Sequence, residues 1–476
     1  MSAVGTPERP LCVAIIGAGP SGFYAAEALL KAPGLTVRVD IYDRLPTPFG
    51  LARGGVAPDH QKIKSVVAVY EKVAMDARVR FLGNVMLGRD INIEDLRARY
   101  DQIVYAVGCE SDRRMSIPGE DLVGSYSATE FVGWYNGHPD HRHKRFDLSC
   151  KNVAVVGIGN VAMDVTRLLA CDPERLAKTD IAHYALDALR ASKVETVWLL
   201  GRRGPAEAAY APVEIEEFGK LEGCDLVVKP EEAVVGPVSR LETADANDKK
   251  KVAYVQERAK RGEGSRSRKI RLRFCVSPVE IIGEGGSVKS VKLEKNKLVD
   301  DGKGGAKCVG IGEFETIPAD MILRSVGYRG IPIPGVAFDE KSGHIPHADG
   351  RVVSGGAPLP GEYVVGWAKR GPSGLIGTNR ADSVLTVLSM LEDLKAGRLP
   401  SRAIDASAEA APKLLSCRGV KTVSYAQWKK LDELERRRGS EKGKIREKFT
   451  TIEEMVAAIA DSRPRESGQP EPELRA

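Results

Sequence analysis

Two glycine-rich turns constrain the fold of this chain more than any other feature. The first is Gly17-Ala18-Gly19-Pro20-Ser21-Gly22 and the second is Gly157-Ile158-Gly159-Asn160-Val161-Ala162, each placed between an apolar run and a helix-forming run. In such a turn the first glycine allows a tight bend, the second lets the backbone approach a pyrophosphate, and the third small residue lets helix and strand pack closely. The alternative is a plain glycine turn without a ligand. We expect an α/β protein with two Rossmann-like nucleotide-binding domains.

Strands and helices alternate around both turns. For the first turn we expect strands at residues 11–17 and 36–42 around a helix at 20–30, and a further buried strand at 103–108. The other expected elements are strands at 153–157 and 194–200, helices at 160–169 and 181–191, charged strands and loops from about residue 224, a strand and glycine turn at 363–374, and a helix at 381–396.

The residues beyond each βαβ unit indicate which nucleotide it binds. Asp43 follows Gly22 by 21 residues, the distance at which a carboxylate accepts hydrogen bonds from a ribose. The second unit is followed by Arg202 and Arg203, where a site for NAD places an acid. Guanidinium groups pair with a 2′-phosphate, so this site is expected to select NADP(H). The alternative is a pair of solvated surface arginines, and the helical insertion accounts for their distance from the glycines.

Composition excludes several classes of protein. Apolar residues make up 42% of the 476 residues and charged residues 29%, which is ordinary for a globular protein. No apolar run reaches the about 18 residues of a membrane span, and no secretory signal is visible. The eight cysteines are scattered without a Cys-x-x-Cys pair, which indicates a reducing compartment and excludes a dithiol reductase. We expect a cytoplasmic protein (or one of the mitochondrial matrix if eukaryotic, although no presequence is visible) without a metal ion or a nucleic-acid partner.

Basic residues concentrate in one part of the chain. Residues 249–273 hold eleven basic and two acidic residues, whereas the whole chain has a net charge of +6. Lys269, Arg271 and Arg273 alternate with apolar residues, so we expect them to share one solvated face of a strand. A local basic surface on a near-neutral body favours an acidic partner, and a mobile solvated loop is the alternative. The histidines of residues 138–143 match no standard metal spacing and predict a solvated loop.

Four longer motifs carry a resemblance to a known family. They are Pro48-Phe49-Gly50-Leu51-Ala52-Arg53, Val56-Ala57-Pro58-Asp59-His60, the Gly-Arg-Arg-Gly-Pro of residues 201–205, and the Val-Gly-Trp-Ala-Lys-Arg-Gly-Pro-Ser-Gly of residues 365–374. From about residue 12 to residue 457 the chain resembles adrenodoxin reductase and its bacterial ferredoxin–NADP reductase relatives. The resemblance implies a glutathione-reductase-type fold in which the NADP domain is inserted into the FAD domain. The implied segments are 1–108 and 330–460 for FAD and 109–329 for NADP, followed by a disordered tail at 461–476.

The resemblance also implies an activity, that of an FAD-dependent ferredoxin–NADP⁺ reductase. NADPH would reduce FAD by hydride, and the flavin would pass single electrons to a [2Fe–2S] ferredoxin that serves a cytochrome P450 or another ferredoxin-dependent enzyme. Two alternatives stay open on the sequence alone. One is an NADPH-dependent flavin diaphorase or monooxygenase with a small-molecule acceptor, and the other is a non-catalytic nucleotide-sensing protein.

Site residues follow from the resemblance by matching position. His60 and Glu217 match a histidine and a glutamate near the nicotinamide and flavin, where a proton relay is proposed for the family. His60 as loop scaffolding, Glu217 as a solvated acid and Trp367 as core are the alternatives. The implied FAD contacts, beyond the glycines of the first turn, are Ser21, Asp43, Leu51, Leu87, Trp367, Gly374, Leu375 and Ile376. The implied NADP(H) contacts, beyond Gly157, are Ile158, Gly159, Asn160, Val161, Arg202, Arg203, Glu214 and Gly374.

The chain departs from the family pattern where a ferredoxin would dock. The family commonly has an arginine at the position of Glu216, and the nearby Ala211-Pro212 also differs. We therefore expect docking of an acidic ferredoxin to depend more on Lys249, Lys250, Lys251, Lys269, Arg271 and Arg273.

Overall fold

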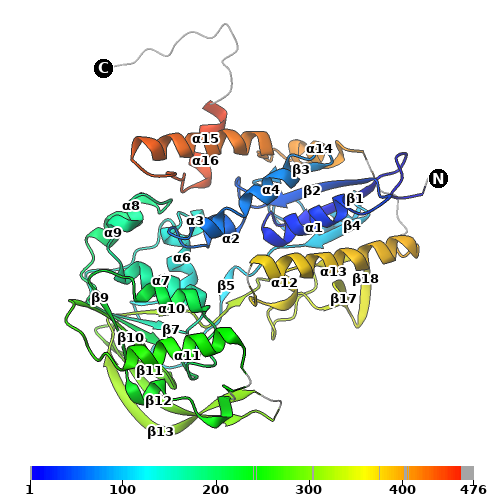
Figure 1. Ribbon diagram of the computed structural model, residues 1–476. Coiled ribbons are helices and arrows are strands. Elements are labelled where there is room, and N and C mark those ends of the chain that lie inside the picture. The colour runs from blue at the N-terminus through cyan, green and yellow to red at the C-terminus, as the bar shows by residue number, and fades with distance from the viewer. Residues whose placement is uncertain are drawn as a thin grey trace, which may run out of the picture. The chain divides into compact units, whose positions relative to one another are not determined.

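The computed structural model describes residues 3–239, 241–242, 244–302, 305–374, 376–400, 405 and 407–461. The chain forms two compact units, each of which contains a sheet packed against helices (Figure 1). Unit 1 comprises Met1–Arg53, Lys62–Gly108 and Gly330–Ala476, and unit 2 comprises Gly54–Gln61 and Cys109–Arg329. The short segment Gly54–Gln61 groups with unit 2, which differs from the continuous first segment 1–108 expected from the sequence.

Unit 1 is built on a seven-stranded sheet of order β16-β17-β18-β4-β1-β2-β3. Every residue of β1, Leu11–Ile16, is buried, and its alternate residues belong to two hydrophobic clusters, with Val13 in one and Ala14 in the other. Period-two alternation sends successive side chains to opposite faces, so this strand lies between two apolar layers. The other strands are β2 (Val37–Asp43), β3 (Val79–Gly83), β4 (Gln102–Tyr105), β16 (His347–Ala348), β17 (Arg351–Ser354) and β18 (Ala357–Val364).

Helices cover the sheet of unit 1. The helix that opens at the first glycine turn, α1 (Pro20–Leu30), lies beside α13 (Ile376–Lys395) (Figure 1). The remaining helices are α2 (Leu51–Gly54) and α3 (Gln61–Lys64) at the boundaries with unit 2, α4 (Val67–Ala74), α5 (Ile93–Arg97), α12 (Trp367–Arg370), α14 (Ala410–Cys417), α15 (Tyr425–Glu441) and α16 (Ile452–Asp461).

Unit 2 repeats this plan with a six-stranded, all-parallel sheet of order β6-β14-β7-β8-β10-β9. Its strands are β6 (Ser125–Ser127), β7 (Asn152–Val156), β8 (Thr196–Leu200), β9 (Cys224–Val228), β10 (Arg268–Arg273) and β14 (Met321–Arg324). A second, antiparallel sheet consists of β11 (Val276–Glu284), β12 (Ser287–Asp300) and β13 (Ala306–Pro318), and β5 (Ser111–Asp112) pairs with β15 (Tyr328–Arg329). Its helices are α6 (Ala128–Tyr135), η1 (Pro139–His141), α7 (Asn160–Ala170), α8 (Glu174–Ala177), α9 (His183–Arg190), α10 (Pro212–Phe218), η2 (Pro230–Ala233), η3 (Pro237–Ser239) and α11 (Ala246–Ala259).

The expected two Rossmann-like domains are confirmed, and three local expectations need correction. Helix α11 lies where the sequence predicted strands and charged loops, because Asp245 caps its first turn and Val252 and Val255 bury one face. Helix α13 begins at Ile376, five residues before the predicted helix at 381–396. Helix α16 extends to Asp461, so the expected tail cannot start there, and residues 462–476 lie outside the described part of the chain. None of the helices described is long and apolar enough to cross a membrane.

Candidate functional site

The first glycine turn has one side closed by protein and one side open. Gly17 has a φ of +110°, and a Cβ there would lie 2.4 Å from the carbonyl oxygen of Ala106. A Cβ at Gly22 would lie 2.2 Å from the carbonyl oxygen of Gly17, so only glycine allows α1 to pack this close to the turn. A Cβ at Gly19, in contrast, would meet no protein atom within 4 Å. Gly19 is therefore not required by packing, and the open space beside it fits a pyrophosphate that approaches the backbone.

Asp43 lies at the carboxyl end of β2 and is tied to the turn. Its Oδ2 accepts a hydrogen bond from the backbone N–H of Ala18 at 2.9 Å, and its Oδ1 accepts one from Leu45 N–H at 2.9 Å. A carboxylate offers about four acceptor positions, to which a ribose hydroxyl can also donate. The geometry fits the expected role of Asp43 beside an adenosine ribose.

Two other segments of unit 1 meet this turn. The backbone N–H of Phe49 donates to Ala18 O at 2.7 Å, and a Cβ at Gly50 would lie 3.0 Å from Gly19 Cα, which brings Leu51 next to the turn. A Cβ at Gly366, whose φ is +69°, would lie 2.1 Å from Ser21 Oγ, and Trp367 follows directly. Of the remaining expected FAD contacts, Leu87 is buried in the core, Gly374 and Ile376 flank the start of α13, and Leu375 lies outside the described residues.

The second glycine turn has the same construction in unit 2. Gly157 has a φ of +115°, and a Cβ there would lie 2.2 Å from Ser325 O, whereas a Cβ at Gly159 would meet nothing within 4 Å. The Asn160 side chain is engaged within the protein, because its Oδ1 accepts from Ala211 N–H at 3.0 Å. A Cβ at Gly201 would lie 2.6 Å from Ile158 Cδ1, so the turn that carries the two arginines packs directly on the glycine turn.

Arg202 and Arg203 are available for an anion. Arg202 is exposed and Arg203 is half-buried, and within the described residues neither guanidinium has an ion pair or a side-chain hydrogen bond. Most arginines of the neighbouring basic stretch are already paired with carboxylates or backbone carbonyls. Two uncompensated guanidinium groups beside an open glycine turn fit a phosphate of a bound dinucleotide.

A cluster of ionisable groups lies beyond this turn, also within unit 2. His60 Nε2 lies 3.2 Å from Glu217 Oε2, and His60 Nδ1 lies 3.6 Å from Asp164 Oδ1. The guanidinium of Arg167 is only 2% exposed and contacts four carboxylates. These carboxylates are Asp59 at 2.8 Å, Asp164 at 2.7 Å, Glu214 at 3.4 Å and Glu217 at 3.2 Å. The structure thus brings together three of the expected residues, His60, Glu214 and Glu217.

The cluster shifts the protonation of its members in opposite directions. Burial opposes the charge of His60, but the hydrogen bond to Glu217 and the nearby carboxylates raise its pKa above the ordinary value. The same hydrogen bond lowers the pKa of Glu217. Burial and the neighbouring Asp164 raise the pKa of Glu214 to about 7. The hydrogen bond between His60 and Glu217 therefore favours the charged form of both groups, next to the Glu214 carboxyl with its pKa of about 7.

Comparisons with known proteins show the family of the chain. Residues 12–178 match the family described as pyridine nucleotide-disulphide oxidoreductase. NADPH-ferredoxin reductase FprA of Mycobacterium tuberculosis is 43% identical over 460 residues, covering 94% of this chain and 99% of FprA. Human mitochondrial NADPH:adrenodoxin oxidoreductase is 41% identical over 467 residues, covering 95% of this chain and 93% of that protein. The chain belongs to the adrenodoxin-reductase-type ferredoxin–NADP reductase family.

A solved structure of the family extends the agreement to three dimensions. The structure of Mycobacterium tuberculosis FprA in complex with NADPH superposes with a TM-score of 0.90 at 42% identity, covering 95% of this chain and 100% of FprA. The family and the fold class expected from the sequence are both confirmed.

Two residues that the sequence analysis missed hold the His60–Glu217 cluster together. Asp164 and Arg167 project from α7, the helix that opens at the second glycine turn, and are spaced i,i+3. The sequence did contain a signal for them, because Asp164 and Arg167 lie among the apolar residues of one helical segment. Charged side chains on a buried helix face need partners, so such residues indicate an ion-pair cluster.

Three side chains of the cluster lie close enough together to suggest a metal site, but the positive charge of Arg167 beside them opposes this interpretation. One ligand atom each of His60, Glu214 and Glu217 lies within 4.8 Å of the others, and within the described residues this is the only such group. Arg167 Nη1 already lies within 3.4 Å of both glutamates. The carboxylates thus have a fixed cation, and we assign no metal to the cluster.

The basic stretch differs most from the sequence analysis. Arg273 was expected on a solvated face but is 2% exposed and paired with Glu232 and Glu315, because β10 lies between β8 and β9 inside the sheet. Lys251 is also buried, and its Nζ donates to Ala208 O at 2.6 Å. Both predictions of a docking role for these two side chains are therefore wrong.

The other cations of the stretch are partly neutralised. Lys269 pairs with Asp225 at 2.7 Å, Arg271 pairs with Glu263 at 2.6 Å, and Lys250 pairs with Glu216 at 2.8 Å. Glu216, the departure from the family pattern, is thus the partner of a candidate docking lysine. Lys249 is exposed and has no ion pair among the residues for which the structure gives positions.

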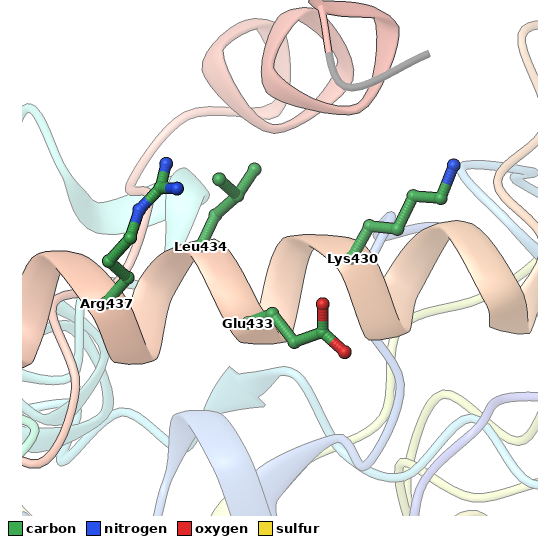
Figure 2. A pocket seen from close by; sticks show the side chains of 4 residues that line it. All are labelled: Lys430, Glu433, Leu434 and Arg437. Atoms are coloured by element: carbon green, nitrogen blue, oxygen red, sulfur yellow. The ribbon is translucent and has the colours of Figure 1, made fainter. Parts of the chain in front are cut away.

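A surface pocket in unit 1 is not a nucleotide site. Figure 2 shows Lys430, Glu433, Leu434 and Arg437 lining it, and all four come from the single helix α15. None of its four lining residues is a glycine and all four lie within one helix, so we assign it no ligand.

Proposed function

We propose that this protein is an NADPH:ferredoxin oxidoreductase that passes electrons from NADPH through FAD to a ferredoxin. The observation that carries this proposal is the open glycine turn at Gly159 beside the guanidinium groups of Arg202 and Arg203, which have no partner among the described residues. Membership of the family adds the partner, because its characterised relatives bear the names of ferredoxin and adrenodoxin reductases.

Each unit is assigned one nucleotide. We assign FAD to unit 1, where Gly19 leaves space for the pyrophosphate and Asp43 accepts from the ribose, with Ser21, Leu51, Leu87, Trp367, Gly374, Leu375 and Ile376 as further contacts. We assign NADP(H) to unit 2, where Gly159 leaves space beside the second glycine turn and Arg202 and Arg203 lie next to it. FAD supplies the redox chemistry, since its ring accepts a hydride and can release electrons singly.

The residues of the chain bind, orient and manage protons. Hydride transfer depends mainly on positioning, so His60 and Glu217 are assigned to proton handling rather than to the hydride path. His60 Nε2 holds a proton against Glu217 Oε2, and Asp164 lies on the other side of the ring. Arg167 fixes the orientation of Glu217 and Asp164 from inside the unit.

The partner assigned to this protein is an acidic [2Fe–2S] ferredoxin. Lys249 and Lys250 are exposed on α11, while Lys269 and Arg271 are paired with carboxylates and contribute a more neutralised surface. Exposed charges steer encounter at a distance set by the ionic strength, so docking through them should weaken as salt increases.

The activity is tested in two half-reactions. The purified protein should be yellow, NADPH should bleach the flavin band under anaerobic conditions, and a [2Fe–2S] ferredoxin should restore it. A colourless protein that takes up no FAD contradicts the proposal. Reoxidation by small quinones without any reaction with a panel of ferredoxins would indicate a diaphorase instead.

Docking is tested by reversing accessible charges only. Lys249→Glu with Lys250→Glu should lower the rate of ferredoxin reduction at low salt and flatten its salt dependence, without changing flavin reduction by NADPH. Lys430→Glu with Arg437→Glu, on the exposed surface of α15 (Figure 2), makes the same charge change elsewhere and is the matched control. If both double variants behave alike at every ionic strength, the ferredoxin does not dock at α11.

A further inference from the structure

The turn that carries Arg202 and Arg203 is fastened to the sheets by its backbone. Gly201 N–H donates to Arg273 O at 2.9 Å, and Gly201 O accepts from Val276 N–H at 3.0 Å. Cys275 N–H donates to Arg203 O at 3.1 Å. These bonds leave the carbonyl of Arg202, at the centre of the turn, to be held by a side chain.

Asn296 of β12 provides that side chain. Its Nδ2 donates to Arg202 O at 2.9 Å and to Ser277 Oγ at 2.8 Å, and its backbone N–H donates to Cys275 O at 2.7 Å. The pairing of β12 with β13 shifts register between Glu294 and Asn296. Such irregularities in a sheet redirect a side chain, and here the amide reaches out of the antiparallel sheet to the arginine turn.

We propose that Asn296 is a positioning residue for cofactor selection, which holds the Arg202–Arg203 turn so that both guanidinium groups converge on the 2′-phosphate of NADPH. The inference rests on the proposed function, since it concerns the NADP(H) site assigned there. Asn296 touches neither the phosphate nor the reacting atoms, and it acts through the backbone of Arg202.

The physical reason lies in the freedom of the two arginines. Because neither guanidinium has a partner within the described residues, their direction depends on the backbone of the turn. Long side chains that must be ordered upon binding cost affinity, and a backbone fixed in advance reduces that cost. Loss of the Asn296 bond should therefore weaken recognition of the 2′-phosphate and leave the rest of the nucleotide unaffected.

Direct binding separates these contributions. We would titrate the FAD-containing protein with 2′,5′-ADP and with 5′-AMP by calorimetry, since the two ligands differ in the 2′-phosphate. Asn296→Ala should weaken 2′,5′-ADP by about 3- to 10-fold, the size of one net hydrogen bond, and should change 5′-AMP by less than about twofold. KM for NADPH should rise by the same factor with kcat unchanged. Ser277→Ala is the matched control, because it removes the second acceptor of the amide and keeps the bond to Arg202.

Each contrary outcome has a distinct meaning. Equal weakening of both ligands by Asn296→Ala would show that the residue supports the fold and would overturn the inference. Unchanged 2′,5′-ADP binding in Asn296→Ala, together with weak binding in an Arg202→Ala/Arg203→Ala variant, would overturn the inference and leave the proposed function intact. Unchanged 2′,5′-ADP binding in the double arginine variant would instead remove the NADP(H) site itself.

Discussion

Replacing Arg167 with methionine should destabilise unit 2 strongly, because it removes the only buried cation of the cluster among the residues described. The guanidinium is 2% exposed, whereas its partners Asp59 and Asp164 are 24% and 15% exposed. Breaking a buried ion pair costs about 3–5 kcal/mol, and the partial solvation of the carboxylates places the expected loss near 3 kcal/mol. Urea unfolding followed by circular dichroism at pH 7.5 measures it.

The pH dependence of the loss identifies its origin. Arg167 lowers the pKa of Asp59 against the effect of burial, so Asp59 stabilises the wild-type fold above its unfolded pKa. In Arg167→Met the unpaired carboxyl should have a raised pKa, and its penalty should shrink as the pH falls toward 5. Adding Asp59→Asn to Arg167→Met removes one uncompensated charge and should recover part of the stability.

Arg190→Met serves as the control for these measurements. Arg190 forms a similar two-point contact with Glu174, but on the surface of α9, so its removal should leave unfolding nearly unchanged. A loss below about 1 kcal/mol in Arg167→Met, or a loss that does not depend on pH, would refute the view that this guanidinium compensates buried carboxylates.

Three further predictions concern the nucleotide site and the cluster. Arg202→Ala with Arg203→Ala should lower kcat/KM for NADPH by about two to four orders of magnitude, since each charge-assisted hydrogen bond to the phosphate contributes about 1.5–3 kcal/mol. The value of kcat/KM for NADH should stay nearly unchanged. Equal losses for both cofactors would show that the arginines support the structure instead of binding the 2′-phosphate. His60→Gln should slow flavin reduction by no more than about 10²-fold, and stopped-flow absorbance that shows no reduction in a variant with both nucleotides bound would contradict its assignment to proton handling. The pKa of Glu214 is raised to about 7, so ionisation of this carboxyl lowers the stability of the folded wild type as the pH rises from the unfolded-state pKa to about 7. Glu214→Gln should remove this pH-dependent loss of stability, which is about 2 kcal/mol after allowance for solvent screening. Melting profiles of variant and wild type that run parallel between pH 5 and pH 8 would contradict the raised pKa.

The elements that the sequence predicted well are those fixed by local chemistry. Helix α1 occupies the predicted residues 20–30. The glycine pattern of each turn lies within one βαβ unit and can be read from the chain alone, although the carbonyls that Gly17 and Gly157 face, those of Ala106 and Ser325, come from later segments.

The features that the sequence could not supply depend on distant partners. Alternation in 269–273 indicated a strand correctly, but the burial of Arg273 depends on Glu232 and Glu315, which come from other segments. Asp59 and Arg167 are 108 residues apart, so their ion pair has no local signature. Helix α11 was missed because its lysines obscured an apolar face, and Lys251 buries its stem while its amine reaches a backbone carbonyl.

The discontinuity of unit 1 has a consequence for synthesis on the ribosome. Strand β4 pairs with β18, so the sheet of unit 1 stays open until residue 364 has emerged, whereas unit 2 has all of its residues once residue 329 is made. We expect unit 2 to fold first, while the edge strand β4 waits with unpaired backbone groups. A nascent chain stalled before residue 357 should thus combine a protease-resistant unit 2 with an aggregation-prone N-terminal sheet, and chaperone binding should concentrate on residues 11–105.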